Sequence, residues 1–137
     1  MKTETDALLA AIHADPRDHV RKLVYADWLL DQGRDDEAEC WRWMGEKGRC
    51  PSLRDDGAWL WWFHHHHADR SAIVPSSLYN VIRKHCPPIQ ANFDWPAWGG
   101  PQTTLARSLR GMVELWLRLT PEERAACWAW VPPEEKS

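Results

Sequence analysis

The chain has 137 residues, of which 44% are hydrophobic and 27% are charged, so it is long and apolar enough for one globular core, and disorder throughout is excluded. Its 17 basic and 20 acidic residues give a net charge of −3, which disfavours nucleic acid as the chief partner because no broad basic surface is available. The N-terminus lacks a signal-peptide core, and no apolar run reaches the about 18 residues of a membrane span, so we expect a soluble, cytoplasmic protein.

Three helices are expected in residues 1–48. The first stops at Asp15-Pro16, because proline cannot continue a helix. The second lies between an aspartate cap at Asp18 and Gly33, which can take the left-handed conformation that ends helices. The third begins at Asp35 and ends before Gly48. Its first turn is acidic, which is the charge that the N-terminal end of a helix dipole favours.

The second of these helices is the apolar anchor of the chain. With 3.6 residues per turn, one apolar stripe contains Val20, Leu23, Val24 and Trp28. Tyr25 and Leu29 lie on the opposite side, so the helix is expected to pack on two sides. Asp27 falls within the main stripe and is therefore predicted to be a buried acid that is held by donors, because an unpaired buried carboxylate is costly.

Asp27 has two interpretations. Burial raises the pKa of a carboxylate and would suit a general acid or base. No partner base, nucleophile or glycine-rich loop accompanies it, however, so we interpret it as a structural residue that caps a helix, pairs with an arginine or accepts from an indole. The sequence therefore predicts no catalytic residue, no cofactor and no enzyme.

The N-terminal segments resemble a known family. Together, Ala7–Ile12, Asp15-Pro16, Arg21–Leu29, Gly33 and Glu37-Ala38-Glu39 are similar to the bacterial repeat-companion domain, with its LLAAI helix, D-P break, RLVYADWL helix and RAE-type third helix. The resemblance covers about the first 45 residues. It implies a bacterial accessory protein that accompanies repeat modules, and it carries no established activity.

This chain departs from the pattern at the third helix. Glu37 occupies the place of the RAE arginine. If that arginine normally pairs with the buried aspartate, another must replace it here, and the candidates are Arg21, Arg34 and Arg42.

The rest of the chain mixes a strand with three helices. A turn-rich connection after Pro51 leads to Trp59–Phe63, a short strand that Phe93–Trp95 would pair with. A helix opens at Pro75-Ser76 and closes at Cys86-Pro87. A further helix is capped by Thr103 or Thr104, and its apolar face consists of Leu105, Leu109, Met112, Val113, Trp116 and Leu117. The last helix follows the capping box of Thr120 and Glu123.

Histidines and cysteines suggest a metal site. The run His64–His67 together with His85 and Cys86 supplies enough imidazole and thiol groups for a zinc site. The weak candidate ligands are His64, His66, His85 and Cys86. Four consecutive histidines cannot all face one ion, and no zinc spacing is present, so a solvated loop is the favoured interpretation. The four cysteines, which lack C-x-x-C spacing, are expected to be free thiols: Cys40, Cys50, Cys86 and Cys127.

Tryptophan is the compositional outlier, with 11 residues. Most are expected to fill the core, but so short a chain can hardly hide all of them, and tryptophan is a preferred anchor at protein interfaces. The candidate interface residues are Trp59, Trp61, Trp62, Trp95, Trp98, Trp128 and Trp130.

The sequence thus predicts a mainly α-helical protein of about six helices with at most a minor two-stranded β element. Residues 1–48 form a repeat-companion-like three-helix unit, residues 49–133 a tryptophan-rich helical remainder packed on it as one domain, and residues 134–137 a tail. The predicted function is that of a non-enzymatic module that binds another protein through an aromatic surface. Two alternatives are a metal-binding protein or metal-dependent enzyme that uses His64–His67, and a single-stranded nucleic-acid binder. The oligomeric state is left open.

Overall fold

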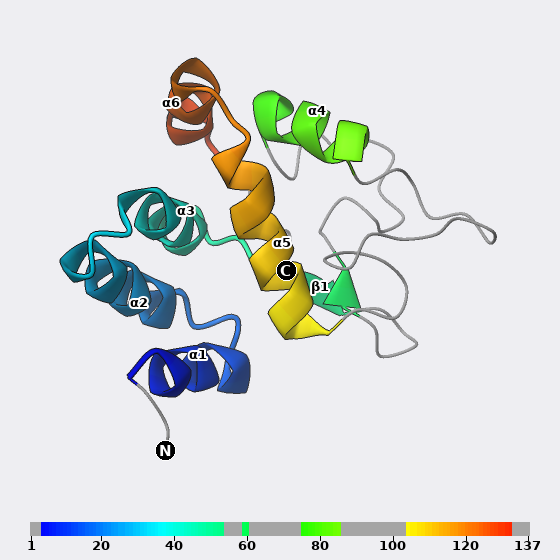
Figure 1. The fold of residues 1–137 in the computed structure, drawn as a ribbon. Helices are drawn as coiled ribbons and strands as arrows, with labels where there is room; N and C mark the ends of the chain where they lie inside the picture. Colours follow the sequence, from blue (N-terminus) through cyan, green and yellow to red (C-terminus); the bar gives the residue numbers. More distant parts are fainter. Residues whose placement is uncertain (1–3, 54–58, 61–74, 86–103, 133–137) are drawn as a thin grey trace. The chain divides into compact units, whose positions relative to one another are not determined.

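A computed structural model of the chain describes residues 4–53, 59–60, 75–85 and 104–132 (Figure 1). This described part is mainly α-helical, as predicted, with six helices and one sheet of two short strands. The chain divides into two compact units, Met1–Cys50 and Pro51–Ser137. The first unit ends two residues beyond the predicted boundary. The packing of the remainder on it as one domain stays a prediction, and the tail lies outside the described residues.

The first unit contains α1 (Glu4–Ala14), α2 (His19–Asp31) and α3 (Asp35–Glu46), shown in blue to cyan in Figure 1. The expected start of α2 is confirmed, because the Asp18 carboxylate accepts a hydrogen bond from the Val20 backbone N–H at 3.2 Å. Such a cap satisfies one of the amide groups that the first helical turn leaves without a partner.

Glycines end α2 and α3 as predicted. Gly33 has a φ of 76° and Gly48 a φ of 64°, the left-handed region that glycine adopts without steric cost. After α2, the Arg34 N–H reaches back to the Leu29 carbonyl at 3.0 Å, and the matching bond after α3 measures 2.8 Å. Both helices therefore end in the same hydrogen-bonded turn, and the chain reverses at defined points.

The prediction that α2 packs on two sides is confirmed for Tyr25 and Leu29 but is wrong for the valines of its main apolar stripe. Its buried residues are Lys22, Tyr25, Ala26 and Leu29. Val20 and Val24, which the sequence assigned to the main apolar stripe, are 65% and 50% exposed. The other two members of that stripe, Leu23 and Trp28, are half-buried. The exposed part of the stripe also carries Asp27, and its exposure avoids the desolvation of a carboxylate.

α2 packs most extensively on α3. The rings of Tyr25 and Trp41 meet edge to face with centroids 5.0 Å apart, an arrangement that aromatic quadrupoles favour. Further along, the two helices approach closely at Gly45. A Cβ atom there would lie 2.7 Å from the Leu23 Cδ2 atom and 3.1 Å from the His19 carbonyl oxygen. Glycine is therefore favoured at this position by the helix spacing rather than by backbone conformation, because a Cβ atom would force the Leu23 side chain to shift.

The second unit opens with a small antiparallel sheet. β1 (Ser52–Leu53) pairs with β2 (Trp59–Leu60), with Ser52 opposite Leu60. The expected strand at Trp59 is confirmed for its first two residues, but its described partner is β1, a segment assigned to the turn-rich connection. The expected partner 93–95 and the strand residues 61–63 lie outside the described part. Consecutive strands usually pair with each other, which explains the hairpin.

Three helices complete the described part of this unit: α4 (Ser76–His85), α5 (Leu105–Leu117) and α6 (Pro121–Ala129). The cap of α5 is Thr104, whose hydroxyl accepts from the Arg107 N–H at 3.2 Å. All of the predicted apolar face of α5 is buried except its last residue, Leu117, which is 45% exposed.

The last helix begins with the predicted capping box. The Thr120 hydroxyl accepts from the Glu123 N–H at 3.1 Å, and the Glu123 carboxylate accepts from the Thr120 N–H at 2.8 Å. α4 is tied to α6 by Ser77, whose hydroxyl donates to the Glu123 carbonyl at 3.2 Å and lies 3.5 Å from the sulfur of buried Cys127. None of the helices in the described ranges has the length and hydropathy to cross a membrane.

Candidate functional site

Most of the predicted site residues lie outside the described ranges, namely Trp61, Trp62, Trp95, Trp98, His64, His66 and Cys86. Trp59 lies in β2 and His85 ends α4, but their side chains are not described. Trp128 and Trp130, at the end of α6, are half-buried. Among the residues that are described, no three His, Cys, Asp or Glu side chains gather in a way that could hold a metal ion.

Asp27 is not a buried acid, so that prediction is wrong. Its side chain is 77% exposed, and one carboxylate oxygen lies 3.6 Å from Nη2 of Arg42 on α3. Arg42 is one of the three arginines that were candidates to pair with Asp27, and it does contact this aspartate. An exposed pair of this length contributes little stability, because water screens it and both side chains stay mobile.

The other two arginines have different partners. Arg21 donates from Nη1 to the Ala11 carbonyl at 2.6 Å, and its Nε lies 3.1 Å from the Asp18 carboxylate. The Ala11 carbonyl belongs to the last turn of α1, where carbonyls lack partners within the helix. Arg34 forms an exposed ion pair with Glu37 at 2.7 Å. Arg21 therefore ties α1 to the start of α2, whereas Arg34 closes the first turn of α3.

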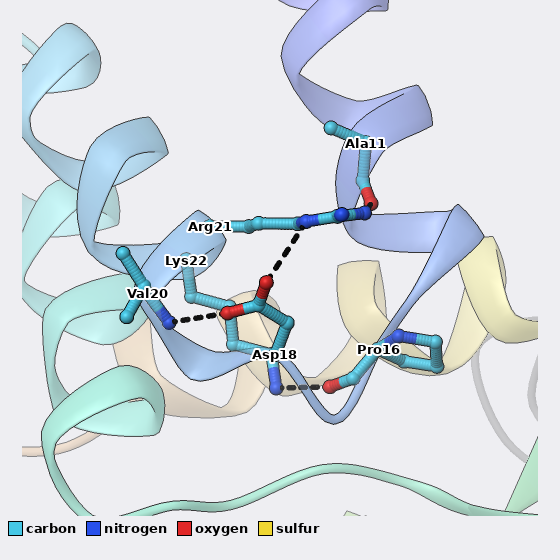
Figure 2. A network of polar contacts seen from close by, with 6 residues as sticks. All are labelled: Ala11, Pro16, Asp18, Val20, Arg21 and Lys22. Carbon is cyan, nitrogen blue, oxygen red and sulfur yellow. Dashed lines mark hydrogen bonds and ion pairs between the residues drawn. The ribbon is translucent and has the colours of Figure 1, made fainter.

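Lys22 is the ionisable group at the centre of the first unit, and the sequence did not single it out as a site. It is fully buried on α2. Its ammonium donates to the carbonyls of Pro16 at 2.7 Å and Arg49 at 3.1 Å, and it lies 3.0 Å from Nδ1 of His19. Figure 2 shows the side chain running past Asp18 to Pro16 in the link between α1 and α2. One amine thus joins the segment before α2 to the segment after α3.

The protonation state of this amine follows from its contacts. An ammonium group only donates, so His19 accepts through Nδ1 and carries its own ring proton on Nε2. Burial lowers the pKa of Lys22 to about 8, against the attraction of Cys50 and Asp18. Burial likewise raises the pKa of the Cys50 thiol, against the attraction of Lys22. At neutral pH, the amine is therefore charged and the thiol protonated.

This arrangement indicates a structural role for Lys22 rather than a catalytic one. A catalytic lysine needs a neutral amine that a substrate can reach. Lys22 is instead enclosed, and its three protons face three acceptors. We interpret it as the residue that fixes the ends of the three-helix unit.

A sequence signal for Lys22 does exist. Together with Tyr25, Ala26 and Leu29 it follows the i, i+3, i+4, i+7 spacing of a core face. A charged lysine is unusual in such a stripe, but its long aliphatic chain lets the ammonium reach backbone carbonyls at the end of a helix. A short aspartate side chain has no such reach, so the stripe that contains Asp27 is the weaker choice of core face.

The solvent-facing side of α2 is the second feature of the unit. We call it the outer face, and it consists of Val20, Val24, Asp27 and Asp31. These residues recur at spacings of three and four, so they lie on one side of the helix. The two valines form an exposed apolar pair near the N-terminal end, and the two aspartates follow toward the C-terminal end. Arg17, also exposed, lies in the turn just before α2.

A comparison of the chain with protein-family models, curated proteins and solved structures finds no match.

Proposed function

We propose that the protein is a non-enzymatic accessory module that binds a partner protein through the outer face of α2. One observation carries this proposal: Val20 and Val24 are 65% and 50% exposed one helical turn apart, although α2 buries its opposite side. Single exposed apolar residues are ordinary, but an adjacent pair on a rigid helix is a surface whose burial by a partner is favourable.

The charges around the valines define the chemistry of the partner. Asp27 and Asp31 follow the valine pair toward the C-terminal end of α2, so this end of the outer face is acidic. The complementary surface presents apolar side chains opposite the two valines and basic side chains opposite Asp27. Charge matching of this kind selects the orientation of a partner more than it adds affinity.

We also propose that tryptophan side chains contribute to partner binding, as the sequence predicts. Trp128 and Trp130 are the candidates whose side chains are described, and both are half-buried. Half-buried tryptophans leave an edge that a partner can cover, so α6 is a second contact region of the module. The resemblance of residues 7–39 to bacterial repeat-companion domains supports an accessory role, and we propose the cytoplasm as the site of action.

The test uses a matched pair of variants. Val24→Asp places a charge in the outer face, whereas Val131→Asp makes the same change at an exposed valine of the second unit. Neither side chain is part of the core, so both variants should fold like the wild type. A partner that binds the wild-type protein in its own host is identified, purified and titrated against all three proteins.

We expect Val24→Asp to weaken binding of the purified partner at least about tenfold, a loss typical of a residue central to an interface, and Val131→Asp to leave it unchanged. The bound segment of the partner should present basic side chains opposite Asp27. Equal affinities of the wild type and Val24→Asp would refute the outer face as the binding surface.

A further inference from the structure

The amine of Lys22 is enclosed by its hydrogen-bond partners. The side chain is fully buried, and its three N–H groups face three acceptors, which are the carbonyls of Pro16 and Arg49 and Nδ1 of His19. A neutral amine has two N–H groups and one lone pair, so it satisfies two acceptors and needs one donor. If the amine lost a proton and nothing else changed, one of the three contacts would therefore bring two lone pairs together.

His19 is the partner that can remove this conflict. A backbone carbonyl always accepts, whereas a neutral imidazole carries its proton on either of its two nitrogens. With the proton on Nδ1, the ring donates to the neutral amine across the same 3.0 Å contact, and both carbonyls keep their N–H donors. His19 is also half-buried, so it borders solvent where Lys22 does not.

We propose that Lys22 and His19 form a pH-sensitive switch, in which the amine passes a proton to Nδ1 of His19 and the ring releases its Nε2 proton to water. The proton moves along the 3.0 Å hydrogen bond between the two nitrogens. The pair loses one proton and one positive charge in total, and the ring exchanges one neutral tautomer for the other. This inference concerns the inward side of α2 and does not depend on the proposed binding by its outer face.

The surroundings of the amine set the pH range in which the switch acts. Burial lowers the pKa of Lys22 to about 8, attraction by Cys50, Asp18 and Asp15 opposes this shift, and repulsion by Arg17 adds to it. Cys50 follows α3, and the other three charged groups lie in the link between α1 and α2. A midpoint of about 8 is close to neutrality, so a rise of one pH unit from there converts most of the molecules.

The switch changes a donor into an acceptor at Nε2 of His19. That nitrogen lies beside the end of α3, because a Cβ atom at Gly48 would be 3.7 Å from it. The Pro16 and Arg49 carbonyls accept from the amine in either state. The ends of the three-helix unit therefore stay fixed as pH rises, and the change is carried to the half-buried ring.

Nitrogen-15 NMR of the imidazole rings in the full chain tests the switch, because the chemical shifts report which ring nitrogen carries the proton. Between pH 7 and pH 9.5, the proton of His19 should move from Nε2 to Nδ1. The midpoint should equal that of the Lys22 side chain, about 8, measured by the shift of its Cε atom. An ordinary histidine loses its charge mainly below this range. His13 on α1, whose pKa is lowered by burial, is the internal control and should keep one tautomer.

Three variants assign the signals and separate the pair from its neighbours. His19→Gln identifies the His19 resonances among those of the seven histidines. Lys22→Met removes the amine, so His19 should keep one tautomer between pH 7 and pH 9.5. Cys50→Ser removes the nearby thiol but retains the amine and the ring, so the exchange of tautomers should persist.

Four results would overturn the inference. The wild-type protein could show no exchange of tautomers at His19, or an exchange whose midpoint differs from that of Lys22. The exchange could also persist in Lys22→Met or disappear in Cys50→Ser, and either result would assign it to a group other than this amine. If a variant does not fold, the wild-type comparison of His19 with Lys22 and His13 decides alone.

Discussion

Replacing Lys22 with methionine should change stability in a pH-dependent way. Methionine has a similar length and keeps the buried stem, but it removes the ammonium that donates to the Pro16 and Arg49 carbonyls at 2.7 and 3.1 Å. Leaving buried carbonyls without a donor costs about 1–3 kcal/mol each. The same substitution also removes a buried charge. At pH values at which the Lys22 amine is protonated, this removal offsets part of that cost.

The size of the offset follows from the pKa. Folding lowers the pKa of Lys22 from 10.5 to about 8. Between these values, the unfolded chain retains a proton that the folded chain has released, so raising the pH favours the folded state. At about 1.4 kcal/mol per pKa unit, the full contribution is about 3 kcal/mol, of which about 2 kcal/mol is gained between pH 7 and pH 9.5. The destabilisation caused by Lys22→Met should therefore be about 2 kcal/mol larger at pH 9.5 than at pH 7.

Urea denaturation followed by circular dichroism at pH 7 and pH 9.5 measures this difference. Burial raises the pKa values of Cys50 and Tyr25, and these groups act in the opposite direction as pH rises. Tyr25 remains unchanged in the variant, so its effect cancels in the comparison with the wild type. Loss of the Lys22 charge raises the pKa of Cys50 further, and this effect adds to the expected difference. Lys84→Met, which removes an exposed amine on α4, is the matched control and should show no such pH dependence. A destabilisation by Lys22→Met that is equal at both pH values would refute the buried-amine description.

Three further substitutions test other parts of the structure by the same denaturation assay. Asp27→Asn should change the free energy of unfolding by less than about 0.5 kcal/mol, because its pair with Arg42 is exposed. A loss of several kcal/mol would show instead that Asp27 is buried, as the sequence predicted. Gly45→Ala should destabilise by about 1 kcal/mol, because overlap with Leu23 outweighs the better helix propensity of alanine. The cost of Gly45→Ala should be smaller when it is measured in a Leu23→Ala background, and an equal cost in both backgrounds would refute the overlap. Thr120→Ala should cost about 1 kcal/mol by removing the capping box, whereas Thr120→Ser should cost less; equal losses would show that the hydroxyl is not the cause.

Helix ends were predictable from the sequence because their causes are local. Asp18, Thr104 and Thr120 each act within three residues of their own position, through one side-chain oxygen and a nearby backbone N–H. Gly33 and Gly48 end helices because only glycine takes a positive φ without steric cost. Such rules need no knowledge of the rest of the fold, so the described boundaries agree with the expected ones.

The buried side of α2 was not predictable in the same way. Two apolar stripes share this helix, and the choice between them depends on what α3 and the segment after it provide. The Arg49 carbonyl, far along the chain from Lys22, makes burial of that lysine possible, and no spacing rule within α2 refers to it. The small sheet gives a similar lesson, because the described partner of Trp59 is Ser52–Leu53, a segment with no strand-like pattern of its own.

The contact between Lys22 and Arg49 also determines how the first unit can be excised. A fragment cut after residue 48 would contain all three helices and still lack one of the two carbonyls that hold the central amine. The smallest autonomous piece therefore extends at least through Arg49. Any graft of these helices onto another protein has to carry that residue with its backbone in place.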